Sequence, residues 1–182
     1  AQNPNDSFGD GLREWSKLTR NIMIWDYVVQ FTHLVSPFPN LRVLQPNIRF
    51  FVENGTNAHF QQGNREVGGE FNELRQYLIA RLLWDPDCDI EAEMDDFLRH
   101  YYHEAAPYIR QYIDLMHDEL EASGQKLHIF FNPEDFCDSS YLRDELMTRY
   151  EALFSQAMEA VDDQPDVLLR VKAAHMPLTY AL

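Results

Sequence analysis

Apolar positions are spaced differently in the two parts of this chain. Up to about residue 65, short apolar runs lie among Pro, Asn, Gly and aromatic residues. The β-branched and aromatic residues of 22–29 predict a strand, and the prolines of "SPFPN" (36–40) end it, because proline does not fit inside a central strand. A short helix over 46–54, with Pro46 in its first turn, then leads to a short strand over 56–63.

From Gly69 onward the spacing is helical, with apolar residues recurring every three or four positions. The pair Asp85-Pro86 ends the first of these helices, Asp89 begins the next, and Gly124 stops the third. The helices that this spacing predicts cover residues 69–84, 89–105, 105–123, 139–161 and 165–180, with a short extended run at 127–131.

The order strand, helix, strand, long helix is typical of a parallel α/β unit, and the later helical run indicates a separate layer. The predicted fold is therefore mixed α/β and helix-dominated. A complete eightfold α/β barrel takes about 250 residues. If residues 1–85 belong to a barrel, they supply only part of one, and residues 86–182 form the helical region packed on it.

The charge of the chain limits its partners. Lys and Arg total 15 against 30 Asp and Glu, which gives a net charge of -15. Without a basic patch the chain is not expected to bind nucleic acid or an anionic membrane surface. Neutral ligands such as sugars are compatible with this charge. No apolar run reaches the ~18 residues of a membrane span, and the first residues do not resemble a signal peptide.

The two cysteines, Cys88 and Cys137, are too few for a disulfide framework and lack metal-site spacing. One disulfide or two free thiols are equally compatible with the sequence. The histidines of "HYYHE" (100–104) and the aspartates of "DPDCD" (85–89) do not match the zinc or calcium motifs that they superficially suggest. Acidic residues near the start of the helix after 69, Glu70 and Glu73, are explained by the helix dipole. We therefore expect no metal or other cofactor.

Polar groups at the ends of the two predicted strands are the candidate site. Trp25, Asp26 and Tyr27 interrupt an apolar strand, and His59 and Gln61 end the second one. A structural alternative is a strand-end cluster with the Trp in the core and the carboxylate capping a helix. Side chains alternate along a strand, so His59 and Gln61 share one face. We expect Phe60 to point to the core on the opposite face.

The chain contains the short motifs W-D-Y, P-F-P-N-L, L-R-x-Y-L and L-L-W-D-P in this order. In these motifs it resembles a large bacterial family long described as a domain of unknown function. The resemblance covers residues 18–116, and the helices after Gly124 match only in style. That family has a glycoside-hydrolase-like barrel similar to those of α-glucuronidases and hexosaminidases. It includes endo-β-N-acetylglucosaminidases that act on N-glycans.

The resemblance implies that the two strands are later strands of a barrel whose C-terminal ends face a glycan. It makes Trp25, Asp26, Tyr27, His59 and Gln61 substrate-binding residues, with Asp26 the best available carboxylate. It also implies a periplasmic or extracellular location, and the remainder of the barrel, or another copy of the chain, as partner. The expected substrate contains N-acetylhexosamine or uronic acid.

One position departs from the family's pattern. A glutamate followed by Gln-Gly is expected after the second strand, but "FQQG" has Gln61 there. An amide cannot serve as a general acid or nucleophile, so no catalytic carboxylate pair is assigned. The first hypothesis is a segment of a glycoside hydrolase-like protein that forms part of a glycan cleft. The alternative is a non-catalytic helical carbohydrate-binding or interaction module.

Overall fold

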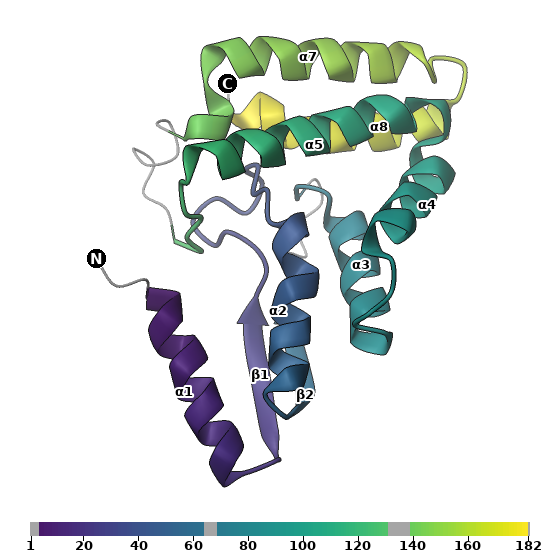
Figure 1. Ribbon diagram of the computed structural model, residues 1–182. Helices are drawn as coiled ribbons and strands as arrows, with labels where there is room; N and C mark the ends of the chain where they lie inside the picture. Colours follow the sequence, from purple (N-terminus) through teal and green to yellow (C-terminus); the bar gives the residue numbers. More distant parts are fainter. Residues whose placement is uncertain (1–3, 64–68, 131–138, 182) are drawn as a thin grey trace.

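The computed structural model describes residues 4–63, 69–130 and 139–181. A layer of long helices lies across one end of the molecule, and a small sheet with its covering helices extends from it (Figure 1). The elements, in chain order, are α1 (Pro4–Leu18), β1 (Ile22–Tyr27), α2 (Leu41–Glu53), β2 (Thr56–Gln62), α3 (Asn72–Trp84), α4 (Ile90–Tyr102), η1 (His103–Ala105), α5 (Ala106–Ser123), η2 (Ser140–Leu142), α7 (Asp144–Glu159) and α8 (Pro165–Ala181).

The sheet of the described residues has two strands, β1 and β2, which pair in parallel. Trp25 lies opposite Phe60 and Asp26 opposite Gln61, with an irregularity in the register between Ile22 and Met23. Helix α2 connects the two strands, as parallel pairing requires. The predicted mixed α/β, helix-dominated fold is confirmed at this level, and both strands lie where the sequence placed them.

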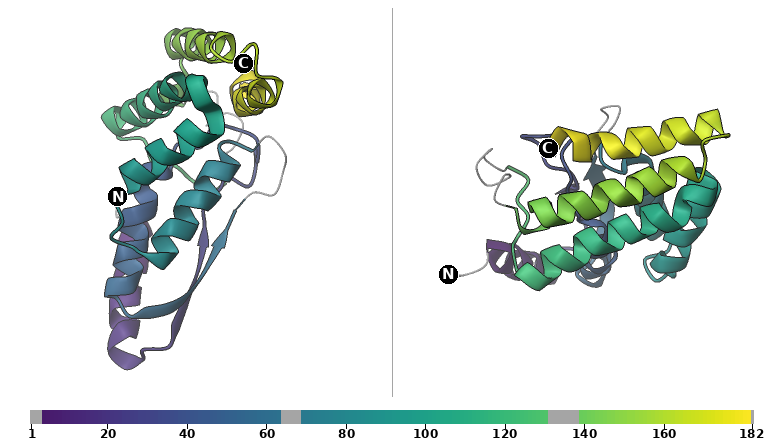
Figure 2. Two further views of the ribbon diagram at one scale, coloured as in Figure 1. Left: turned by 90° about the vertical axis from the view of Figure 1, so that its right-hand side faces the viewer. Right: turned by 90° about the horizontal axis from the view of Figure 1, so that it is seen from above.

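Helices α1 and α2 cover the same face of the sheet. Ile24 of β1 is buried in one small cluster with Leu12 of α1 and Phe51 of α2. The edge of the Phe8 ring meets Phe51, with the ring centroids 6.3 Å apart. Seen from the side, both helices lie on one side of the strands, and no described helix covers the other side (Figure 2). The sequence pattern did not predict α1.

Helix α2 begins at Leu41, five residues before the predicted start at Pro46. Pro46 therefore lies inside the helix, where it cannot donate a hydrogen bond to the preceding turn. The first turn forms because the backbone N–H of Leu41 donates to Nε2 of the buried His117, 3.1 Å away on α5. This cap comes from a residue distant in sequence, so local spacing could not indicate it.

The main core joins the helical layer to the sheet end of the molecule. One buried cluster extends from Val28, just after β1, to Leu178 on α8. At its centre Tyr112 of α5 meets Tyr150 and Phe154 of α7, with ring centroids 5.0 and 4.8 Å apart. The division into domains at residue 85 stays a prediction.

The later helices end close to the predicted residues, but one predicted helix and one predicted extended run differ. The predicted helix 139–161 divides into η2 and α7, because the extended backbone of Arg143 separates them. The predicted extended run at 127–131 forms no strand in its described part, 127–130, although Ile129 accepts a hydrogen bond from the Phe31 N–H at 2.7 Å. Among the described helices, none has the length and apolar character needed to cross a membrane.

Candidate functional site

The two faces of the sheet differ in what covers them. Ile24, Asp26, His59 and Gln61 point toward the helices, and the side chains between them point the other way. We call this second face the open face. On it, Trp25 is 59% exposed, Tyr27 45% and Phe60 44%. Large aromatic groups are rarely exposed together without a binding role.

The expected alternation of β2 is confirmed, but the assignment of its inner face is wrong. Phe60, predicted to point to the core, lies on the open face. His59 points inward instead, and its ring centroid lies 5.7 Å from that of Phe51 on α2. The covering helices decide which face is inner, and the alternation of one short strand does not reveal where they pack.

The aromatic groups of the open face are held in fixed positions. The Trp25 and Phe60 rings meet at an angle of 67°, with their centroids 4.7 Å apart. The indole Nε1 of Trp25 donates a hydrogen bond of 2.8 Å to Oε1 of Gln62. A ring held from two sides loses little conformational freedom when a ligand stacks on it.

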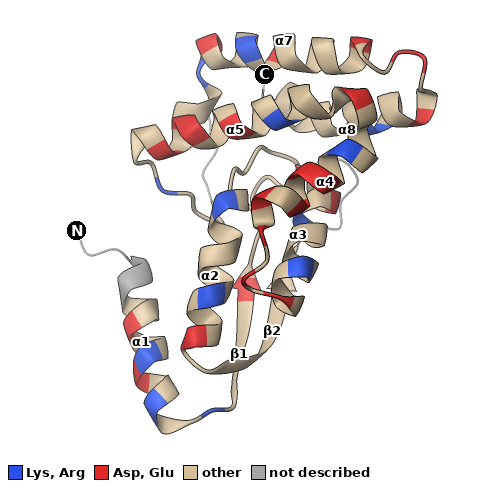
Figure 3. Ribbon diagram, turned by 45° about the vertical axis from the view of Figure 1, so that its right-hand side comes forward, with Lys and Arg blue, Asp and Glu red and all other residues tan. Residues whose placement is uncertain are grey.

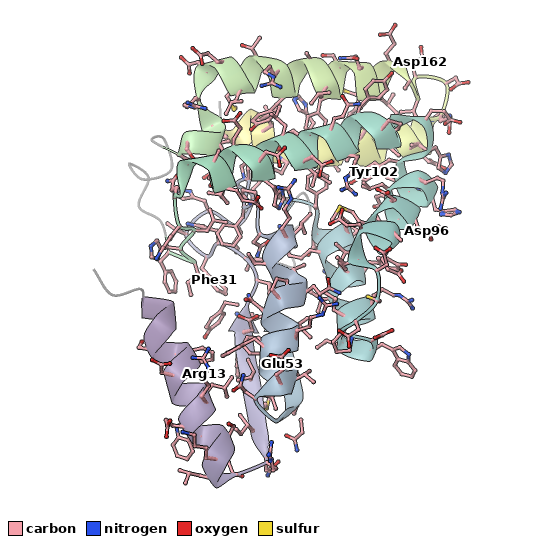
Figure 4. The ribbon with its side chains drawn as sticks, viewed as in Figure 1. Arg13, Phe31, Glu53, Asp96, Tyr102 and Asp162 are labelled. Atoms are coloured by element: carbon pink, nitrogen blue, oxygen red, sulfur yellow. The ribbon has the colours of Figure 1, made fainter. Side chains whose placement is uncertain are left out.

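The aromatic row continues beyond the C-terminal end of β1. The ring of Tyr27 meets the edge of Phe31 at 5.1 Å between centroids, and Phe31 lies 5.8 Å from Phe130. Phe31 is found beyond the arrowhead of β1 and below the helical layer (Figure 4). Phe130, after α5, is 69% exposed. Sequence reasoning did not identify Phe31 and Phe130, because they lie outside the strands and approach Tyr27 only through the fold.

Three of the predicted site residues lie on the helix-covered face. Burial raises the pKa of Asp26, while the Tyr27 backbone N–H and, less strongly, the Gln61 side chain lower it. The Gln61 amide nitrogen makes no hydrogen bond of good geometry with the described residues. Burial lowers the pKa of His59, whose Nε2 lies 2.9 Å from Oγ1 of Thr56. The structure thus brings Trp25 and Tyr27 together on one face, and Asp26, His59 and Gln61 on the other.

A buried polar network follows the C-terminal end of β1. Arg75 of α3 pairs with Glu70 at 2.7 Å, and both side chains are about 95% buried. Arg75 Nε also donates to Asn40 Oδ1 at 3.0 Å, and the Asn40 amide donates to the Val28 carbonyl at 3.0 Å. Glu70 was expected to complement the helix dipole, but its main partner is Arg75. This network fixes the backbone that carries the strand ends.

The backbone beside this network is strained at Phe71. Its φ of 43° is in the left-handed region, which β-carbon contacts make unfavourable, and the side chain is buried. Packing of the Phe71 ring against Tyr112, 5.9 Å between centroids, holds it there.

Charge is distributed unevenly over the molecule. Acidic residues are concentrated along α4 and the segment before it (Figure 3). By the alternation of the two strands, the open face carries none. The groups of that face are Met23, Trp25, Tyr27, Ala58, Phe60 and Gln62.

Among the described residues, no three His, Cys, Asp or Glu side chains lie close enough together to hold a metal ion. Cys88 is a free thiol, and Cys137 lies outside the described residues.

The architecture is that of a parallel α/β unit whose uncovered face carries neutral aromatic and amide groups. Residues 1–114 match the family described as "Domain of unknown function (DUF4838)". The match covers more than half of the chain, so the protein belongs to the DUF4838 family. No curated protein and no solved structure matches it significantly.

Proposed function

We propose that this chain is a segment of a glycoside hydrolase-like protein and that its open face forms part of a glycan-binding cleft. The observation that carries the proposal is the exposed, fixed row of Trp25, Tyr27 and Phe60 on an uncharged sheet face. Pyranose rings present apolar C–H faces that stack on aromatic rings, and their hydroxyl groups bond to amides and phenols. The substrate contains N-acetylhexosamine or uronic acid, and the protein acts in the periplasm or outside the cell.

The proposal divides the open face into two levels. In a barrel, the interior is packed with side chains, and only the layer at the C-terminal ends of the strands meets the ligand. Met23, two layers below Tyr27 on β1, is covered by the remainder of the barrel. Tyr27 and Gln62, the last residues of their strands, contact the glycan together with Phe31.

The same proposal includes Asp26, His59 and Gln61, but their part in substrate binding is indirect. Because they point toward α1 and α2, they act by holding the strand ends in position. We assign Asp26 to binding or positioning rather than to catalysis. The catalytic carboxylates come from strands outside these 182 residues.

Calorimetric titration of the full-length protein encoded by the gene tests glycan binding. The ligands are chitooligosaccharides, a complex N-glycan and a glucuronic-acid oligosaccharide. Tyr27→Ala is expected to weaken binding about tenfold, which corresponds to ~1.4 kcal/mol. Trp84→Ala is the matched control, since Trp84 is 87% exposed on α3, away from the sheet. Absence of saturable binding to all three glycans would overturn the proposal.

The alternative is a non-catalytic carbohydrate-binding or interaction module, and Gln61 favours it. An amide where the related pattern has a carboxylate removes acid–base chemistry from this strand end. Binding without hydrolysis of any bound glycan by the whole protein would select this alternative. Hydrolysis that survives Gln61→Ala would select the enzyme and exclude Gln61 from its chemistry.

A further inference from the structure

A groove of about 580 Å³ lies between α1 and the edge of β1, and Met23 links it to the open face. Its walls are mostly apolar and are formed by Phe8, Leu12 and Trp15 of α1 and by Ile22 and Met23 of β1. Phe8 is 52% exposed, Trp15 62% and Met23 60%. A helix that packs on a sheet normally buries such residues, so part of this apolar surface lacks its partner in the described chain.

The backbone at the edge of this groove is unpaired within the described sheet. Val28 donates its N–H to the Gln62 carbonyl, so the alternate residues of β1 before it, Asp26 and Ile24, also face β2. By the same alternation, the N–H and C=O groups of Met23 and Trp25 point to the opposite edge. Such an edge is a template for one more strand.

The position of α1 determines which strand fits. Ile24 contacts both α1 and α2, so the two helices lie on the same face of the sheet. Crossover connections between parallel strands are right-handed in about 98% of cases. The connection through α2 places β2 on one side of β1. A right-handed connection through α1, on the same face, therefore places the preceding strand on the other side, in the groove.

We infer that the groove between α1 and β1 is the docking site for an extended segment of the same polypeptide that precedes α1 and pairs with β1 in parallel. The segment alternates side chains, so that every second one is apolar and enters the groove. Gly11 supports a close approach, because a β-carbon at this position would meet no atom within 4 Å. This segment is a partner for the sheet of the proposed function. The inference rests on that proposal only in one respect, namely that the sheet is part of a larger one.

Hydrogen exchange of single backbone amides, followed by NMR, tests the inference. Two proteins are compared: the 182-residue chain and the full polypeptide that its gene encodes, with any residues that precede Ala1. The amides of Met23 and Trp25 are expected to exchange about 100-fold more slowly in the longer polypeptide. Those of Ile24 and Asp26, which face β2, are the internal control and are expected to change little.

A pair of variants provides a second measurement. Gly11→Leu has free space in the 182-residue chain and is expected to leave its stability unchanged or higher, but to destabilise the longer polypeptide by occupying the groove. Glu14→Leu adds the same side chain to α1 outside the groove and is expected to affect both polypeptides equally. Equal exchange of Trp25 in both polypeptides, equal effects of Gly11→Leu, or a gene without an extended segment ahead of Ala1 would each overturn the inference.

These results are independent of the glycan titration. Protection of the β1 edge without glycan binding would support the strand and overturn the proposed function. Glycan binding without protection would do the reverse.

Discussion

The side chain of His117 on α5 caps the first turn of α2, because its Nε2 accepts a hydrogen bond of 3.1 Å from the Leu41 backbone N–H. The other ring nitrogen, Nδ1, donates to the Ile113 carbonyl at 2.7 Å. These two bonds require a neutral imidazole with its proton on Nδ1. The contact links the helical layer to the strand–helix unit, and it is buried.

The first prediction is that this contact makes stability depend on pH. Burial, with smaller contributions from Arg42 and Arg75, lowers the pKa of His117 below its ordinary 6.5, whereas Glu70 and the Ile113 carbonyl oppose this. As the pH falls, His117 takes up a proton near pH 6.5 in the unfolded chain, but only at a lower pH in the folded protein. His117 therefore stabilises the fold fully above about pH 6.5. That contribution falls as the pH decreases, by at most ~1.4 kcal/mol per pH unit. Urea unfolding between pH 8 and 5 measures it.

Two variants separate the cap from the titration. His117→Gln keeps an acceptor near the position of Nε2 but cannot take up a proton, so it is expected to flatten the pH dependence. His117→Leu removes both the cap and the titration and is expected to cost about 1–2 kcal/mol at pH 8. Other histidines, including the partly buried His59, contribute equally to all three proteins. A His117→Gln profile parallel to that of the parent would contradict the assignment.

The second prediction concerns the buried pair of Arg75 and Glu70. Arg75 also donates to the carbonyl of Phe38 and to Asn40, so its fork of donors binds three residues in two separate segments. Arg75→Met is expected to lower the free energy of unfolding by about 3–5 kcal/mol, because it leaves the Glu70 carboxylate buried without its partner. Chemical denaturation provides the measurement.

Arg81→Met is the matched control on the same helix. Arg81 pairs with Glu93 at 2.6 Å, but 45% of its side chain is exposed. Its loss is expected to cost at most about 1 kcal/mol. Arg75→Lys is expected to recover little of the lost stability, since one ammonium group cannot reach Phe38, Asn40 and Glu70 together. Full recovery with Lys would show that charge alone matters at this position.

The sequence predicted most helix ends of the helical layer and both strands, because their signals are local. Asp89 accepts from the Ala92 N–H as an N-cap, and Gly124 adopts the left-handed conformation that ends α5. The start of α2 could not be predicted, since it depends on His117, which is 76 positions from Leu41. The inner face of β2 depends in the same way on where α1 and α2 pack.

The candidate site was predicted only in part for the same reason. Trp25 and Tyr27 stand out because polar aromatic groups interrupt an apolar strand, and both lie on the open face. Phe31 joins them through ring contacts that no spacing indicates. The Arg75–Asn40 bond connects residues 35 positions apart. Such contacts follow from the path of the loop after β1, which contains two prolines and has no periodic pattern.

The third prediction compares two glycines. Gly124 has a φ of 66°, and a β-carbon there would meet no atom within 4 Å, so only backbone strain opposes a side chain. Gly124→Ala is expected to cost about 1 kcal/mol. Gly11 lies inside α1 and also has free space around it, so in the 182-residue chain Gly11→Ala is expected to stabilise by up to ~1 kcal/mol. Thermal unfolding of the two variants should therefore shift in opposite directions.

The last prediction is that Gln61→Glu destabilises the protein at neutral pH. Residue 61 lies opposite Asp26 in the parallel register, on the face that the helices cover. The pKa of Asp26 is already raised, with burial as the main cause. A second carboxylate beside it would raise the pKa values of the pair further, since two like charges at close range disfavour ionisation.

The sign of the pH effect follows from these raised pKa values. The folded variant holds a proton that the unfolded chain has released, so the variant loses stability as the pH rises through the unfolded values near 4. Its deficit relative to the parent is expected to be small near pH 4 and to reach at least ~1 kcal/mol at pH 7. Gln61→Met, similar in size and unable to ionise, should show a deficit that does not grow with pH. A Gln61→Glu protein as stable as the parent at pH 7 would mean that residue 61 reaches solvent or a ligand. That result would restore Gln61 to the cleft side of the sheet, where a glutamate has a catalytic use.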